Sequence, residues 1–96
     1  MTREEAKDWI SKKCGDGWLT LVDEIYDNLP HGIKIKSIYQ KWGALNFTAS
    51  PWTDETELIH DHVESKSLEI CEICGNEGSE VTIDGWVHTR CPNHQK

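Results

Sequence analysis

The 96-residue sequence lacks any long hydrophobic run. No apolar stretch approaches the roughly 18 to 20 residues that a membrane-spanning helix needs. Residues 1–5 also lack the apolar segment that a secretory signal peptide would begin to show. We therefore expect a cytoplasmic protein. Because disulfides are rare in that compartment, its four cysteines should be either reduced or bound to a metal.

Basic residues are scarce where acidic ones gather. The net charge is −7, and residues 50–80 carry nine acidic residues against one lysine, whereas residues 28–49 carry three lysines and no acid. A module that binds duplex nucleic acid normally presents a broad basic face to the phosphates. The charge therefore disfavours nucleic acid as a partner, and only residues 28–49 offer a small basic surface.

Aromatic residues are few, but five of the eight are tryptophans. A chain of 96 residues makes one small domain, near the size at which a hydrophobic core alone gives marginal stability. Large tryptophan side chains help such a core, and a structural metal is a common supplement. The composition therefore predicts a globular chain whose stability includes a metal.

The last quarter of the chain contains two pairs of metal-binding residue types. Two residues separate Cys71 from Cys74, and two separate Cys91 from His94. This spacing lets both members of a pair reach one tetrahedral Zn²⁺, and four protein ligands leave no position at which water could be activated. The pattern predicts one structural zinc ion per chain. Two alternatives stay open: reduced cysteine pairs without a metal, and His88 as the fourth ligand in place of His94.

The segment between the two ligand pairs has the pattern of a β-hairpin. Residues 80–83 and 86–89 contain β-branched residues and flank Asp84 and Gly85, where the glycine provides the positive φ of a tight turn. The order of knuckle, hairpin and second ligand pair resembles a treble-clef zinc finger. In treble clefs the second pair lies on the first turn of a helix. We expect a turn or so of helix here, because the sequence ends at Lys96.

Two helices are predicted in the first third of the chain. Thr2 and Glu5 match a capping box, and the helix that they start is expected to run to about Lys13. After a break that contains two glycines, a second helix with apolar residues at helical spacing is expected to end at Pro30. We expect the main core to consist of Trp18, Leu21, Val22, Ile25, Leu29, Ile35, Leu45 and Phe47.

Residues 33–48 have the alternating polarity of an antiparallel pair of strands. Ile33 and Ile35 share one phase of the alternation, but Ile38 has the other phase. A β-bulge adds one residue to a strand and so restores the phase. We therefore expect a bulge near Ser37.

A third helix is predicted before the zinc ligands. Ser50 and Pro51, followed closely by acidic residues, have the pattern of a helix start, and the helix is expected to run to about Ser67. Its narrow apolar stripe consists of Leu58, Ile59, His62 and Val63. The whole chain is thus predicted to be a small α+β domain, with residues 1–70 as a body of helices and a β-hairpin and residues 71–96 as a zinc finger packed on it.

Several motifs occur together in this chain: Gly17-Trp18-Leu19, the strand pair of residues 33–47, Glu64-x-x-Ser67, Cys71-Glu-x-Cys74-Gly75 and Gly85-Trp86-x-x-Thr89-x-Cys91-x-x-His94. Together they resemble a family of small uncharacterised phage and prophage proteins, over most of the chain and most specifically at the carboxy-terminal pattern. The resemblance implies a phage-type protein in the cytoplasm of a host cell. The chain departs from the family in the strand pair, because residues 37–47 lack the family's arginine, which weakens a phosphate-binding role.

Three classes of function fit the sequence. The first is a non-enzymatic protein, stabilised by zinc, that binds or inhibits a host or defence protein through an acidic surface made of Asp54, Glu55, Glu57, Asp61 and Glu64. The second is a binder of nucleic acid or of a nucleotide-like ligand through Lys34, Lys36, Lys41 and Trp42. The third, an enzyme such as a hydrolase, needs a nucleophile or an acid–base pair that no motif indicates. We therefore predict surface recognition of a protein partner without turnover.

Overall fold

A computed structural model describes residues 1–95 of the chain. Its elements in chain order are α1 (Arg3–Lys13), α2 (Leu19–Asn28), β1 (Lys34–Lys41), β2 (Ala44–Ser50), α3 (Asp54–Ser67), β3 (Ser79–Ile83), β4 (Trp86–Arg90) and the 3-10 turn η1 (Pro92–His94). The strands form two antiparallel pairs, β1–β2 and β3–β4. The predicted α+β class is thus confirmed. Within residues 1–95, no helix has both the length and the apolar composition that crossing a membrane would require.

The first helix begins at the predicted capping box. The Thr2 hydroxyl accepts a hydrogen bond from the backbone N–H of Glu5 at 3.1 Å, and the Glu5 carboxylate accepts one from the backbone N–H of Thr2 at 2.8 Å. These two bonds satisfy N–H groups that a helix start leaves without a partner. Ion pairs from Arg3 and Lys7 to Asp23, at 3.2 and 3.0 Å, then link α1 to α2.

The β1–β2 hairpin contains the predicted bulge. Its register shifts between Ile35 and Ser37, and as a result Ile35 and Ile38 are both buried. The turn consists of Trp42 and Gly43, with φ of 56° and 81°. A two-residue turn with positive φ at both positions matches the twist of the strands that it connects.

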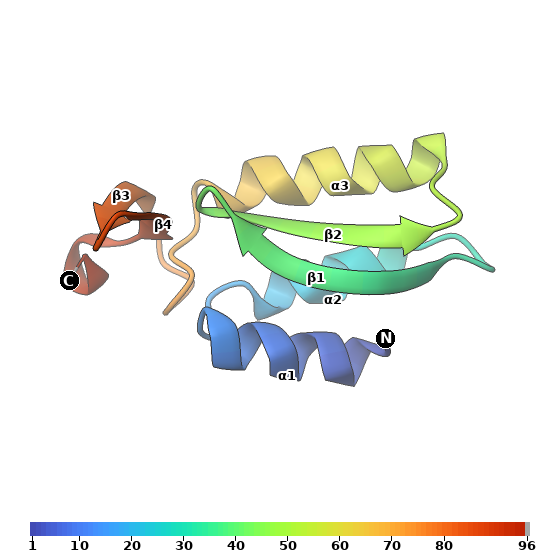
Figure 1. The fold of residues 1–96 in the computed structure, drawn as a ribbon, viewed down its shortest axis with the longest axis horizontal. Coiled ribbons are helices and arrows are strands. Elements are labelled where there is room, and N and C mark those ends of the chain that lie inside the picture. The colour runs from blue at the N-terminus through green and yellow to red at the C-terminus, as the bar shows by residue number, and fades with distance from the viewer. Residues whose placement is uncertain (96) are drawn as a thin grey trace.

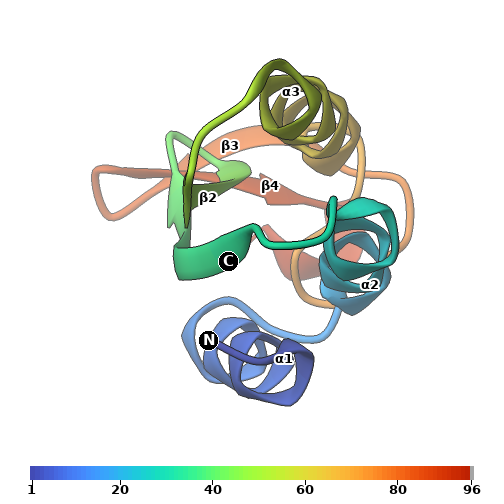
Figure 2. The ribbon, with the colours of Figure 1, turned by 90° about the vertical axis from the view of Figure 1, so that its right-hand side faces the viewer.

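The hydrophobic core lies between the three helices and the β1–β2 hairpin (Figures 1 and 2). Helix α3 packs against β2 and helix α1 packs against β1. Helix α2 lies between α1 and α3 and contacts both. The predicted core residues Trp18, Leu21, Val22, Ile25, Ile35, Leu45 and Phe47 are buried, Leu29 is half-buried, and Ala6, Ile10, Ile38 and Val63 complete the core. The core is therefore larger than predicted, because α1 and α3 both contribute to it.

Helix α3 starts later than predicted. Thr53, not Ser50, is the N-cap, and its hydroxyl accepts a hydrogen bond from the backbone N–H of Thr56 at 3.2 Å. Ser50 is instead the last residue of β2, and it pairs with Lys34 of β1. The prediction was wrong because a hydroxyl residue followed by acids occurs twice within four positions, and the pairing of β2 decides between them.

The apolar stripe predicted for α3 is partly wrong. Val63 is buried, but Leu58 is 71% exposed and His62 is also exposed. A polar residue occupies part of the buried face: the Ser67 hydroxyl accepts a hydrogen bond from the backbone N–H of Leu45 at 2.8 Å. Buried polar groups of this kind are tolerated because they are paired.

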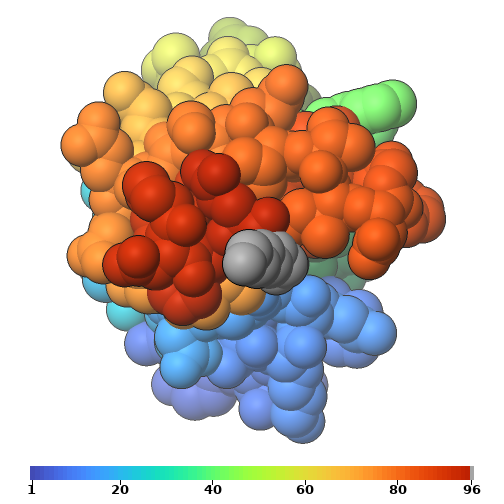
Figure 3. Space-filling model, turned by 90° about the vertical axis from the view of Figure 1, so that its left-hand side faces the viewer, coloured from blue at the N-terminus to red at the C-terminus, as the bar shows by residue number. Residues whose placement is uncertain are grey.

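The finger, defined as residues 71–95, covers one end of the body (Figure 3). The backbone N–H of Gly17 donates to the Glu72 carbonyl at 2.9 Å, and the Trp18 indole N–H donates to the Ile70 carbonyl at 2.8 Å. A Cβ atom at Gly17 would lie 1.9 Å from the carbonyl oxygen of Cys71. Only glycine allows the two backbones to approach this closely. The backbone just before α2 is therefore in direct contact with the finger.

Candidate metal centre

The four predicted zinc ligands lie together at the end of the molecule. The sulfur atoms of Cys71, Cys74 and Cys91 and a ring nitrogen of His94 all lie within 4.8 Å of one another. The Cys74 and Cys91 sulfurs are 3.6 Å apart, and the Cys91 sulfur is 3.2 Å from His94 Nδ1. In a tetrahedral site with Zn–S bonds of about 2.3 Å, two sulfurs lie roughly 3.8 Å apart. The separations have this size, so the four residues could hold a tetrahedral metal ion.

Each ligand pair is held in a tight turn. In the first turn the backbone N–H of Gly75 donates to the Cys71 carbonyl at 2.9 Å, and Gly75 has a φ of 83°. In the second turn, which forms η1, the backbone N–H of His94 donates to the Cys91 carbonyl at 3.0 Å. Local hydrogen bonds thus fix the spacing within each pair, and the β3–β4 hairpin brings the two pairs together.

The electrostatics of the thiols suit a cation. Burial raises the pKa of Cys71, but hydrogen bonds from the backbone N–H groups of Cys91, Cys74 and Ile73 outweigh burial and lower the pKa to about 6. The N–H of Asn76 lowers the pKa of Cys74, but desolvation and the neighbouring Cys91 and Cys71 raise it on balance. Thiolates this close repel one another, and a cation between them removes the repulsion. Three sulfurs and one imidazole are also a donor set that Zn²⁺ favours.

Glu72 is part of the motif Cys71-Glu-x-Cys74-Gly75, although no role was predicted for it from the sequence, and it is buried beside the four candidate metal ligands. The residue is 1% exposed, and its Oε1 lies 2.7 Å from His88 Nδ1 and 3.5 Å from Arg90 Nε. Its backbone N–H donates to the Thr89 carbonyl at 3.0 Å. Glu72 therefore ties the first ligand turn to β4. His88, the alternative ligand, lies against Glu72, and the four-atom cluster contains His94 instead.

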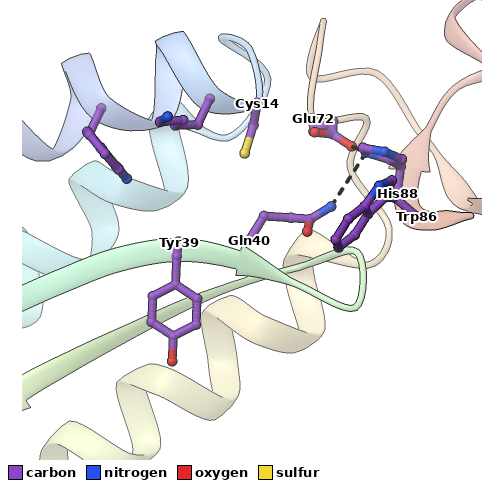
Figure 4. A pocket seen from close by; sticks show the side chains of 8 residues that line it. Cys14, Tyr39, Gln40, Glu72, Trp86 and His88 are labelled. Atoms are coloured by element: carbon purple, nitrogen blue, oxygen red, sulfur yellow. Dashed lines mark hydrogen bonds and ion pairs between the residues drawn. The ribbon is translucent and has the colours of Figure 1, made fainter. Parts of the chain in front are cut away.

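A cavity of about 270 Å³ opens beside Glu72 and His88 (Figure 4). The Gln40 amide points toward these two side chains and donates to the Val87 carbonyl at 2.8 Å. Burial, with the charge of Glu72 as a smaller contribution, raises the pKa of the Cys14 thiol to about 12. Cys14 is therefore protonated at neutral pH and is a poor nucleophile. The cavity contains a carboxylate–imidazole pair, and the cysteine thiol that lines it is protonated.

The predicted acidic residues lie on α3, but they do not share one face. Asp54, Glu55, Glu57 and Asp61 are exposed, and Glu64 is half-buried. At about 100° per residue, Asp54, Glu57, Asp61 and Glu64 fall on one side of the helix, and Glu55 falls on another. We call these four residues the acidic stripe. Glu57 accepts a hydrogen bond from the Trp52 indole at 2.7 Å, and Asp61 and Glu64 lie 3.3 and 3.8 Å from the ring nitrogens of His60.

The residues predicted for an alternative anion site are spread along β1. Lys34 and Lys36 are exposed near one end of the strand, and Lys41 and Trp42 are exposed at the other end. Seven strand residues, at about 3.3 Å each, put the Cα atoms of Lys34 and Lys41 roughly 23 Å apart. A small nucleotide-like ligand cannot contact both ends at once.

Comparison of the chain with protein-family models, with curated proteins and with solved structures finds no match.

Proposed function

We propose that the protein is a non-enzymatic binding protein, stabilised by one zinc ion, that acts on a protein partner. The observation that carries the proposal is the closed donor set. Cys71, Cys74, Cys91 and His94 surround one point, so a zinc ion there has four protein ligands and no open position for water or substrate. Such a zinc ion contributes folding free energy to the finger and takes no part in chemistry.

The residues around the four candidate ligands also support a structural role for the zinc site. The imidazole of His88 and the guanidinium of Arg90 both contact Glu72 Oε1, and this contact satisfies a carboxylate that would otherwise be buried at high cost. A catalytic carboxylate–imidazole pair needs a nucleophile or a bound water beside it. The neighbouring thiol, Cys14, is protonated at neutral pH. The pair therefore connects the first ligand turn to β4.

The acidic stripe of α3 is the surface that we assign to the partner. The stripe lies on the solvent side of the helix together with Leu58, which is exposed although it is apolar. A surface of this composition attracts a basic partner over a distance and adds apolar contact once the partner has docked. In line with the resemblance to phage and prophage proteins, the partner we propose is a host or defence protein in the cytoplasm of the host cell.

The alternative, a nucleic acid or nucleotide-like ligand held by Lys34, Lys36, Lys41 and Trp42, has less support. These residues are divided between the two ends of β1, and the net charge of −7 opposes binding to phosphates. Retention of the protein on immobilised DNA at physiological salt would favour this alternative over a protein partner.

The test of the partner surface is a charge reversal with a matched control. The partner is first captured from host lysate, and its association rate is then measured at low and at high salt. The double variant Glu57→Lys/Asp61→Lys should associate more slowly at low salt, and the difference should shrink at high salt because the Debye length falls. Glu55→Lys, on another side of the same helix, changes half as much charge and should change the rate by less than half as much. Equal rates for the double variant and the parent protein at low salt would remove the acidic stripe from the proposal.

A further inference from the structure

Two tryptophans stand out at the surface, and each belongs to the tip of a hairpin. Trp42, in the β1–β2 turn, is 73% exposed, and Trp86, directly after the β3–β4 turn, is 74% exposed. Both line one hollow of about 410 Å³. The other residues that line this hollow are Gln40, Lys41, Gly85 and Val87. Two aromatic side chains that no hydrophobic core requires therefore form the walls of the same concave surface.

The relative position of the two hairpin tips is fixed. The Thr89 hydroxyl donates to the Gly43 carbonyl at 2.7 Å, and Thr89 is fully buried. A Cβ atom at Gly43 would lie 3.1 Å from Val87 Cγ1 and 3.3 Å from the backbone of His88, so the β1–β2 turn lies directly against β4. Figure 3 shows the green tip of β1–β2 beside the orange β3–β4 hairpin. The backbone around the hollow is thus held in place, which reduces the entropy that binding must cost.

A second hollow, of about 400 Å³, also includes Lys41 and Trp42 and extends to α3. Glu64 of the acidic stripe and Glu80 of β3 both line it, together with the apolar side chain of Leu68. Two carboxylates against one ammonium make the hollow negative overall. A cation is therefore the favoured occupant, and a phosphate is disfavoured.

The backbone at Trp42 indicates that tryptophan is not there to form the turn. Its φ of 56° belongs to the left-handed region, which asparagine, aspartate and glycine occupy more readily than an aromatic residue. The other hairpin uses Asp84, with a φ of 51°, at the equivalent position. Residues in uncommon backbone conformations that folding does not require are found preferentially at binding sites.

We propose that Trp42, Glu64 and Glu80 are the anchor for a basic segment of the protein partner. An arginine or lysine side chain lies on the Trp42 ring with its cation between the two carboxylates, and a neighbouring apolar side chain fills the hollow between Trp42 and Trp86. Cations bind the faces of tryptophan rings, and tryptophans are enriched among the residues that dominate interface energies. This inference rests on the proposed function, because it names the contact point at one end of the acidic stripe.

The test uses a tryptophan-free peptide, acetyl-Gly-Arg-Leu-Arg-Gly-amide, and NMR signals of the five indole N–H groups. The peptide should shift the signals of Trp42 and Trp86. Trp18 is an internal control, because its ring is buried and its N–H donates to the Ile70 carbonyl. The same peptide with glutamate in place of arginine should shift none of the signals. A single-stranded oligonucleotide of eight thymidines serves as the competing ligand class.

Variants then assign the affinity. Trp42→Ala should weaken peptide binding at least about tenfold, as expected for an anchor residue. Glu64→Gln/Glu80→Gln should weaken it by about threefold to tenfold and reduce its salt dependence. Trp52→Phe, at the other end of α3, is the matched aromatic control and should leave the affinity unchanged.

Three results would overturn the inference: no shift of the Trp42 and Trp86 signals, larger shifts with the oligonucleotide than with the peptide, or unchanged affinity of Trp42→Ala. The stripe variant Glu57→Lys/Asp61→Lys separates this inference from the proposed function. If this variant slows association with the captured partner but Trp42→Ala does not affect that complex, the acidic stripe stands and the anchor is wrong. If Trp42→Ala weakens the complex and the stripe variant does not, the anchor stands and the stripe is wrong.

Discussion

The β1–β2 and β3–β4 hairpins have the same kind of turn but are held in place by different means. Both turns contain two residues with positive φ. In β1–β2, Ile35, Ile38, Leu45 and Phe47 are buried in the core. In the strands β3 and β4, Thr89 is the one buried residue. Burial of apolar surface therefore stabilises the first hairpin, and it cannot stabilise the second to the same degree.

The second hairpin is fixed by polar groups instead. The cluster of three cysteines and His94 joins its two ends, and the Glu72 carboxylate contacts the side chains of His88 and Arg90 in β4. Two-stranded hairpins are marginally stable alone, so we expect folding of the finger to depend on the Cys/His cluster and on the contacts of Glu72. The comparison teaches that the chain contains two differently stabilised parts within one small fold, and each can be tested by removing its own support.

The largest effect is expected from Cys74→Ser, which removes one member of the metal cluster. Metal analysis of the parent protein, purified without added zinc, should find close to one equivalent. The variant should lose the metal, and hydrogen exchange should lose protection first in residues 71–95, because zinc binding and folding of the finger are coupled. A variant with undiminished zinc content and melting temperature would contradict the metal assignment.

Leu21→Ala should have the next largest effect, and on the body. Leu21 is 2% exposed in the centre of the core, so its truncation should lower the free energy of unfolding by about 2 to 5 kcal/mol. The matched control is Leu58→Ala on the exposed side of α3, which should change it by less than about 0.5 kcal/mol. Urea denaturation measures both. If the two variants lost similar amounts of unfolding free energy, the apolar residues of α2 would not form the core.

Glu72→Ala should act on the finger more weakly than metal loss. The substitution leaves Arg90 and His88 without their shared acceptor, and it should cost about 1 to 3 kcal/mol of unfolding free energy. Glu80→Ala, an exposed glutamate in β3, is the control and should cost less than about 0.5 kcal/mol. If Glu72→Ala is as mild as Glu80→Ala, the bond to His88 does not fasten the finger.

The features that the sequence predicted correctly are those decided by residues close together in the chain. The capping box of Thr2 and Glu5, the bulge before Ser37 and the two ligand turns depend on spacings of a few residues. The phase change between Ile35 and Ile38 is visible without any knowledge of the fold. Local spacing was therefore enough to predict most elements and the grouping of Cys71, Cys74, Cys91 and His94.

The features that the sequence missed depend on contacts between distant residues. Glu72 looks like any acid between two cysteines until the finger folds and brings His88 and Arg90 to it. The exposure of Leu58 depends on which side of α3 faces β2, and a narrow stripe does not decide this. Trp42 and Trp86 belong to separate hairpins, so the hollow that they share has no sequence pattern.

The smallest effect, and the one with the opposite sign, is expected from Trp42→Asn. An ordinary L residue in the left-handed region costs about 1 to 2 kcal/mol, whereas Asn-Gly is the preferred pair for this turn. The variant should therefore unfold at equal or higher urea concentration, with a gain of up to about 1 kcal/mol. Asp84→Asn in the other hairpin, where the residue already suits the turn, should change stability by less than about 0.5 kcal/mol.

The sign of this effect tells the two roles of Trp42 apart. A loss of more than about 1 kcal/mol in Trp42→Asn would mean that the indole packs against the protein and supports the hairpin tips. A gain in stability together with loss of binding to the arginine peptide would mean that the tryptophan is kept at a cost to folding because it binds a partner, as is common for functional residues. The β1–β2 turn would then differ in sequence from the β3–β4 turn for a functional reason, since the two turns have similar φ values.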